Sequence, residues 1–105
     1  MVRENGLDPA RGVYGISVAA GLVGSAPQNL RLYEAKGLLS PARSDGGTRL
    51  YSDNDLERLR DISRLLGDGL NLAGIQAVLE LQATNNRLQL ELDELRGEAG
   101  PPAEG

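Results

Sequence analysis

The segment that decides the fold reads ISVAAGLVGSAPQNLRLYEAKG and spans residues 16–37. It predicts two short helices, the first beginning after Ser17 as its N-cap and the second beginning at Ser25. Ser25 and Gln28 lie three residues apart, which is the spacing of a capping box. Gly24 separates the two helical patterns. Two short helices joined by a tight turn that contains glycine are typical of a helix-turn-helix motif.

A turn-rich segment follows and runs from Leu38 to Tyr51. Its middle, residues 45–47, reads DGG, which favours the tight turn of a β-hairpin, and an apolar pair lies on each side. Arg43 and Arg49 flank the expected tip. The segment therefore predicts a hairpin, or wing, that carries a basic residue on each arm.

Two longer helical patterns make up most of the remaining chain. Ser52 or Asp53 is suited to cap the third helix, and Asn71 is suited to cap the fourth. Apolar residues at helical spacing predict one buried stripe in each helix. They are Leu56, Leu59, Ile62, Leu65 and Leu66 in the third helix, and Ile75, Val78 and Leu79 in the fourth.

A leucine seam extends the fourth helical pattern toward the C-terminus. No glycine or proline lies between Gly74 and Gly97, so the helix is expected to continue through this region. Its apolar residues alternate in steps of three and four, as the a and d positions of a coiled coil do. The seam predicts a homodimer; the alternative is a single amphipathic helix folded onto its own domain. The seam consists of Val78, Leu81, Asn85, Leu88, Leu92 and Leu95, with Asn85 at an a position.

These patterns predict a mainly α-helical chain, a winged helix-turn-helix with a C-terminal dimerisation helix. Residues 1–12 lack periodicity and are expected to form a flexible arm. Residues 13–80 are expected to form the winged helix-turn-helix, and residues 81–97 the coiled-coil helix. Residues 98–105 contain two adjacent prolines and are expected to form a disordered tail.

Composition excludes several classes of function. The 105 residues include no cysteine and no histidine, which removes thiolate and imidazole metal sites, cysteine nucleophiles and the Ser-His-Asp arrangement. The carboxylates fall on helix faces without a histidine, lysine or cysteine partner, so neither an enzyme nor a cofactor is expected. No segment has the apolar length of a membrane span or the pattern of a signal peptide, which predicts a cytoplasmic protein that is associated with the bacterial nucleoid.

The charge is distributed unevenly along the chain. The formal net charge is −4, but residues 13–51 hold four basic and two acidic side chains, whereas residues 52–105 hold five arginines and eleven acidic side chains. A basic first half and an acidic second half favour double-stranded DNA as a partner of the helix-turn-helix region.

The second helix of such a motif enters the major groove of DNA. With Leu30 facing the core, Gln28, Asn29 and Arg31 are expected to lie outward and to contact base edges. Other residues are candidates for contacts to phosphate or sugar. They are Ser17, Tyr33, Lys36, Arg43, Thr48, Arg49 and Tyr51, and for Tyr33 and Tyr51 a half-buried core position is the alternative.

Residues 14–62 resemble the MerR family of bacterial transcription regulators, and the similarity extends over about residues 14–80. The matching pieces are Ile16-Ser17 with Ala19-Ala20, Leu30-Arg31 with Tyr33-Glu34, Gly37-Leu38-Leu39 with Pro41 and Arg43, and Arg49 with Tyr51-Ser52 and Asp55. The resemblance implies a winged helix-turn-helix that binds DNA. The metal-sensing branch uses cysteine at the dimer helix, and this chain has none. The drug-sensing branch carries a separate C-terminal ligand domain, which is expected to be absent too.

Within that family the chain is most similar to the HspR-type heat-shock repressors. The similarity lies in ISVAA, in Pro27-Gln28, in Gly46-Gly47 and in GLNLAGI at residues 69–75. It implies repression of chaperone genes, with the chaperone DnaK able to act as co-repressor. Leu32, Asn29 and Thr48 depart from residues that are common at these positions, which affects the expected target sequence and affinity rather than the fold.

Two functions remain open from the sequence. The first is a homodimeric regulator, a repressor or an activator, that binds a pseudo-palindromic operator. The second is an interaction module whose acidic helix docks a chaperone, a sigma factor or another regulator through Glu91, Asp93 and Glu94. The two functions are compatible in a co-repressor scheme.

Overall fold

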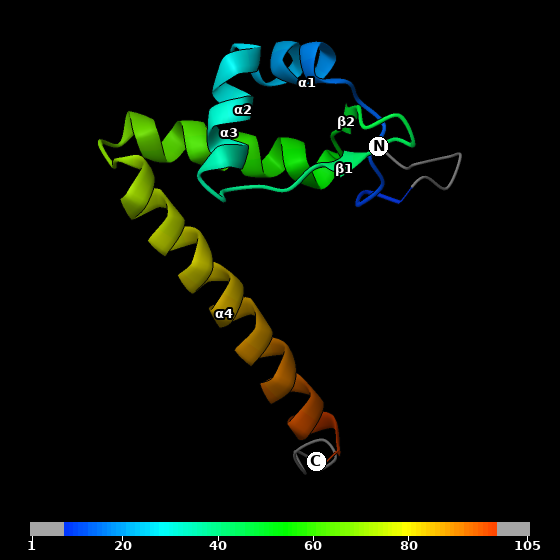
Figure 1. The fold of residues 1–105 in the computed structure, drawn as a ribbon. Coiled ribbons are helices and arrows are strands. Elements are labelled where there is room, and N and C mark those ends of the chain that lie inside the picture. The colour runs from blue at the N-terminus through cyan, green and yellow to red at the C-terminus, as the bar shows by residue number, and fades with distance from the viewer. Residues whose placement is uncertain (1–7, 99–105) are drawn as a thin grey trace.

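A computed structural model describes residues 8–98 of the chain. Three helices form a small body, a β-hairpin lies at one side of it, and the last helix leaves the body as a long rod (Figure 1). The elements are α1 Ile16–Val23, α2 Pro27–Ala35, β1 Ala42–Arg43, β2 Arg49–Leu50, α3 Asp53–Gly67 and α4 Leu72–Glu98. None of the helices in this described part of the chain is long and apolar enough to cross a membrane.

The core is built on the apolar stripe of α3. Leu56, Leu59, Ile62 and Leu65 are buried, as the helical spacing predicts. Leu66, predicted to join them, is 37% exposed, because it lies about 100° around the helix from Leu65 and so turns away from the stripe. The other buried side chains come from every part of the body and include Ala19, Ala20, Leu30, Leu38, Leu39, Ile75 and Leu79.

The starts of the first two helices differ from the prediction. The N-cap of α1 is Gly15, so Ser17 lies inside the helix and does not cap it. Helix α2 begins at Pro27 after an Ala26 N-cap that makes no side-chain hydrogen bond. Proline accounts for this start, since its fixed φ suits the first helical position and its missing N–H needs no partner there.

The turn between α1 and α2 forms where the sequence places it. Gly24 caps α1 in the left-handed region, at φ 70°, where glycine is favoured. The predicted Ser25 capping box is wrong, because the Ser25 hydroxyl instead accepts a hydrogen bond of 3.1 Å from the Asn29 side-chain amide. The tight turn brings α2 against α1 as a helix-turn-helix requires.

Helix α3 begins with a complete capping box, and Ser52 rather than Asp53 is the N-cap. The Ser52 hydroxyl accepts the backbone N–H of Asp55 at 3.0 Å, and the Asp55 carboxylate accepts the backbone N–H of Ser52 at 2.9 Å. This reciprocal pair satisfies two backbone donors that a helix start leaves open.

The wing is a two-stranded antiparallel hairpin, as predicted. Ala42 pairs with Leu50 and Arg43 pairs with Arg49, so the two arginines lie opposite each other across the strands. Gly47 takes φ 86° at the tip, which explains a glycine at that position. Leu38 and Leu39, expected at the start of the hairpin, are buried in the core instead.

Part of the expected N-terminal arm packs against the wing and α3. The Asn54 backbone N–H donates to the Pro9 carbonyl at 3.1 Å, and Tyr14 forms an antiparallel bridge with Tyr51. Gly12 lies so close to Leu50 that an added Cβ would come within 2.6 Å of the Leu50 carbonyl oxygen. Residues 8–12 are therefore part of the folded body, while residues 1–7 and the expected tail from residue 99 lie outside the described residues.

Helix α4 is one continuous helix, as the absence of glycine and proline predicts. The Asn71 side chain accepts the backbone N–H of Gly74 at 2.8 Å and so caps its start. Ile75 and Leu79 are buried against the body, and Val78 packs partly against it. Beyond this first part α4 leaves the body, which contradicts the alternative of a helix folded onto its own domain (Figure 1). Its exposed leucines are Leu81, Leu88, Leu90, Leu92 and Leu95.

Candidate nucleic-acid interface

Helix α2 has one buried face and one polar face. Leu30 is fully buried, while Gln28 and Arg31 are exposed near the N-terminal end of the helix, as the helical spacing predicts. Asn29 is half-buried, and its side-chain amide nitrogen is engaged with Ser25. Contact to an adenine edge needs both the oxygen and the nitrogen of an amide side chain. Gln28 and Arg31 are therefore better placed than Asn29 to contact bases.

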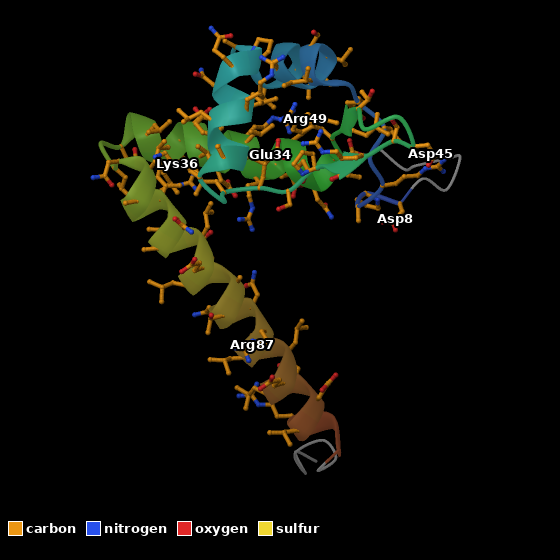
Figure 2. All side chains as sticks on the ribbon, viewed as in Figure 1. Asp8, Glu34, Lys36, Asp45, Arg49 and Arg87 are labelled. Carbon is orange, nitrogen blue, oxygen red and sulfur yellow. The ribbon has the colours of Figure 1, made fainter. Side chains whose placement is uncertain are left out.

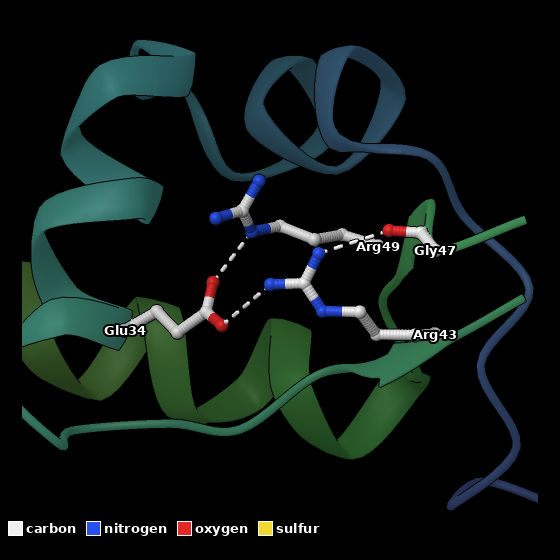
Figure 3. Close-up of polar contacts among 4 residues, drawn as sticks. All are labelled: Glu34, Arg43, Gly47 and Arg49. Atoms are coloured by element: carbon white, nitrogen blue, oxygen red, sulfur yellow. Dashed lines mark hydrogen bonds and ion pairs between the residues drawn. The ribbon is translucent and has the colours of Figure 1, made fainter.

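Glu34 connects α2 to both arms of the wing (Figure 3). Its Oε1 accepts a hydrogen bond from Arg49 Nε at 2.5 Å, and its Oε2 accepts one from Arg43 Nη2 at 3.2 Å. The two arginines thus share one carboxylate that comes from the predicted recognition helix. This contact fixes the position of the wing relative to α2.

The two arginines change the pKa of the Glu34 carboxylate that they share. The hydrogen bond from Arg49, helped by the positive charges of Arg49 and Arg43, lowers the pKa of Glu34 below its usual 4.5, although partial burial opposes the shift. The same hydrogen bond raises the pKa of Arg49 above its usual value. The pKa shifts of Glu34 and Arg49 therefore both favour the charged forms of these two side chains.

Arg43 also closes the wing on itself. Its Nη1 donates to the Gly47 carbonyl oxygen at 2.9 Å (Figure 3). The turn is closed further by Ser44, whose backbone N–H donates to the Thr48 carbonyl at 2.8 Å and whose hydroxyl accepts the Thr48 N–H at 3.2 Å. The Thr48 side chain is exposed beside this turn.

The two tyrosines predicted as contacts to phosphate or sugar lie in the core. Tyr51 is fully buried, and Tyr33 is 6% exposed. Tyr33 lies three residues after buried Leu30 on the same face of α2, and Tyr51 is enclosed because the N-terminal segment pairs with it. Both positions agree with the alternative of a core position, and a contact from these two side chains to DNA stays a prediction. The Tyr51 hydroxyl has no hydrogen-bond partner among residues 8–98, and burial raises its pKa above 10.0.

The remaining candidates for DNA contact, Ser17 and Lys36, lie outside the surface formed by the N-terminal end of α2 and the wing arginines. Ser17 is exposed in the first turn of α1. Lys36 is exposed at the C-cap of α2, where a positive charge also interacts favourably with the helix dipole. Figure 2 places Lys36 and the wing tip at Asp45 on opposite sides of the body. The structure therefore brings α2 and the wing arginines together but does not bring Lys36 to the wing.

The role of Glu34 was missed in the sequence. A lone acidic side chain between Arg31 and Lys36 was a usable signal, because an acidic residue on a basic surface needs a partner nearby. Over the part of the chain that the structure describes, no cluster of acidic side chains could hold a metal ion.

The chain matches the protein-family model described as "MerR HTH family regulatory protein" over residues 14–82. This range contains α1, α2, the wing, α3 and the first part of α4.

Individual relatives agree with that match. The chain is 49% identical over 84 residues to a Streptomyces coelicolor protein with the name "Putative heat shock protein HspR", covering 79% of this chain and 56% of the relative. It is 40% identical over 67 residues to the HTH-type transcriptional regulator GlnR of Bacillus anthracis, covering 64% of this chain and 52% of the relative. The chain thus spans about half the length of these curated relatives.

Solved structures share the fold. The N-terminal part of the Bacillus subtilis multidrug transporter activator, MtaN, superimposes with a TM-score of 0.61 at 30% identity, covering 83% of this chain and 92% of that one. HiNmlR, a MerR family regulator solved bound to promoter DNA, gives a TM-score of 0.64 at 28% identity, covering 79% of this chain and 67% of that one.

Proposed function

The chain belongs to the MerR HTH family of regulatory proteins, and from this we propose that it is a sequence-specific DNA-binding transcription regulator. The observation that carries the proposal is the joined surface of α2 and the wing. Exposed Gln28 and Arg31 lie on the helix that the motif inserts into the major groove, and Glu34 holds the basic wing beside that helix.

The regulator is proposed to act as a homodimer on a pseudo-palindromic operator. The support is the unpartnered seam of α4, where Leu88 is 52% exposed in the single chain. A row of exposed leucines at heptad spacing is stabilised when a second helix covers it. A two-fold dimer carries two recognition helices and so contacts two symmetry-related half-sites.

Repression of stress or chaperone genes is the finer proposal. It rests on the 49% identity to the HspR relative, together with the match of GLNLAGI at residues 69–75 that the sequence shows. The chaperone DnaK is the proposed co-repressor on the same ground, and the cytoplasm is the proposed location. The family match covers the helix-turn-helix and the wing, which favours DNA binding over a pure interaction module.

Selection of bound duplexes from a random pool tests DNA binding and the dimer together. We expect enrichment of two half-sites related by two-fold symmetry. Arg31→Ala should weaken binding to the selected duplex by about 1–3 kcal/mol, the range for a base contact. The control is Arg87→Ala, because Arg87 lies on α4 away from α2 and pairs with Glu91 at 3.6 Å (Figure 2). No enrichment over the starting pool would contradict the proposal.

Two matched leucines test the dimer. Leu88→Gln changes a seam residue, whereas Leu90→Gln changes a leucine that is 65% exposed and lies off the seam. In sedimentation equilibrium we expect the Leu88 variant to shift toward monomer and the Leu90 variant to remain a dimer. An unaltered chain that stays monomeric at every concentration would contradict the dimer without affecting the fold.

A further inference from the structure

We propose that Glu34 is a positioning residue that orients Arg49 for contact with a DNA phosphate, while Arg43 holds the wing and makes no DNA contact. This inference rests on the proposed DNA-binding function. It assigns different roles to Arg43 and Arg49, which look equivalent in the sequence because they flank the wing tip on either side.

Within the described part of the chain, both terminal nitrogens of Arg49 are without a hydrogen-bond partner. Only its Nε is used by Glu34, and among residues 8–98 no hydrogen bond is made by either of its Nη groups. Figure 3 shows the contact with the Glu34 carboxylate leaving from Arg49 Nε, with none drawn from either Nη atom. The side chain is 29% exposed, so it is held on one side and open on the other. A guanidinium fixed through Nε still presents paired N–H donors, which suit the oxygens of a phosphate.

Arg43 uses its terminal nitrogens within the protein. Nη1 donates to the Gly47 carbonyl and Nη2 to Glu34 Oε2, at 2.9 Å and 3.2 Å. One bond closes the wing turn, and the other ties the wing to α2. Each Nη of Arg43 therefore has one N–H left for another partner, whereas both N–H groups of each Arg49 Nη are unused among residues 8–98. Arg43 is therefore assigned to the wing itself.

Removing the charge of Glu34 tests its role, because the direction of the change in DNA affinity depends on what Glu34 does. A carboxylate near bound DNA repels phosphate, so its neutralisation should tighten binding if repulsion were its main effect. If Glu34 positions Arg49, neutralisation should weaken binding although a negative charge is lost. The two explanations thus predict opposite changes in affinity.

Glu34→Gln is the test variant and Asp45→Asn is its control. Glutamine keeps the size of Glu34 but loses its charge, and its one amide oxygen replaces the two oxygens that serve Arg43 and Arg49, so the bond to Arg49 Nε is weakened. Asp45 is an exposed acidic side chain at the wing tip, and its exchange removes the same charge (Figure 2). On the duplex recovered by selection, we expect Glu34→Gln to weaken binding roughly tenfold, as for a charge-assisted hydrogen bond. Asp45→Asn should leave binding unchanged or slightly tighter. Tighter binding by Glu34→Gln would overturn the proposal.

The salt dependence of binding tests the two arginines separately. Each phosphate contact contributes about 0.9 to the slope of log K against log salt concentration. We expect Arg49→Gln to reduce the slope by about this amount for each protomer bound, and Arg43→Gln to leave it unchanged. A slope reduced by Arg43→Gln and not by Arg49→Gln would reverse the assignment and overturn it.

A measurement without DNA separates this inference from the proposed function. By NMR, the Arg49 Nε–H of the free 105-residue chain should exchange slowly with solvent, and it should exchange quickly in Glu34→Gln. Circular dichroism verifies that the variant is folded. Fast exchange in the unaltered chain would overturn the positioning role even if DNA binds. Slow exchange without any DNA binding would overturn the proposed function and the phosphate contact of Arg49, and leave only the link between Glu34 and the wing.

Discussion

The hydroxyl of Tyr14 donates a hydrogen bond of 2.8 Å to the carboxylate of Asp53, a residue 39 positions later in the chain. Tyr14 lies just before α1, and Asp53 is the first residue of α3. The bond therefore fastens the segment that leads into the helix-turn-helix to the start of α3, which supplies more buried core residues than any other element of the described chain. It acts beside the backbone pairing of Tyr14 with Tyr51.

Tyr14→Phe should lower the free energy of unfolding by about 1 kcal/mol, the usual net value of a hydrogen bond in a folded protein. The ring remains, so packing against the core is kept and the loss reports the hydroxyl alone. Urea unfolding followed by circular dichroism measures it. Unchanged stability would show that this bond contributes nothing in solution.

Tyr51→Phe should have the opposite result. The Tyr51 hydroxyl is buried without a hydrogen-bond partner among the described residues, so removing it also removes a desolvation cost. We expect stability that is unchanged or raised by up to about 1 kcal/mol. Affinity for the selected duplex should not change, because the side chain is fully buried. A clear loss of affinity would instead restore Tyr51 as a DNA contact.

Ser52→Ala should destabilise the fold by about 1 kcal/mol, since the Ser52 hydroxyl accepts one of the open backbone donors of α3 and is buried with it. The matched control is Ser17→Ala. Ser17 is exposed and does not cap α1, so its exchange should change stability by less than about 0.5 kcal/mol. Equal losses in the two variants in thermal unfolding would contradict the capping assignment.

Acid should weaken the contact between the wing and α2. The pKa of Glu34 is lowered in the folded chain, so its charged form stabilises the fold. This contribution is fully present above the usual pKa of 4.5 and is lost as the pH falls through the lower folded value. Glu34→Gln lacks the titrating group. We therefore expect the stability difference between the unaltered chain and this variant, measured by urea unfolding, to shrink below pH 4.5. A difference that is constant with pH would contradict this role of the charge.

Local patterns in the sequence were sufficient to predict most elements. The spacing of Leu56, Leu59 and Ile62 predicts the buried face of α3, and Gly24 predicts the turn of the helix-turn-helix. The uninterrupted run after Gly74 predicts one long helix. These features depend on residues a few positions apart, whose conformational preferences act within a single turn or helix. The starts of α1 and α2 were misplaced because more than one nearby residue could serve as a cap.

Contacts between distant segments could be decided only by the tertiary structure. Glu34 lies 9 residues from Arg43 and 15 residues from Arg49, and no local pattern shows that the hairpin folds back onto α2 to bring them together. Tyr51 is buried because the N-terminal segment pairs with it, which its own neighbours in sequence do not reveal. The sequence by itself thus determined which helices and turns form. Their packing decided which side chains of the recognition surface remain exposed, because burial depends on the whole chain.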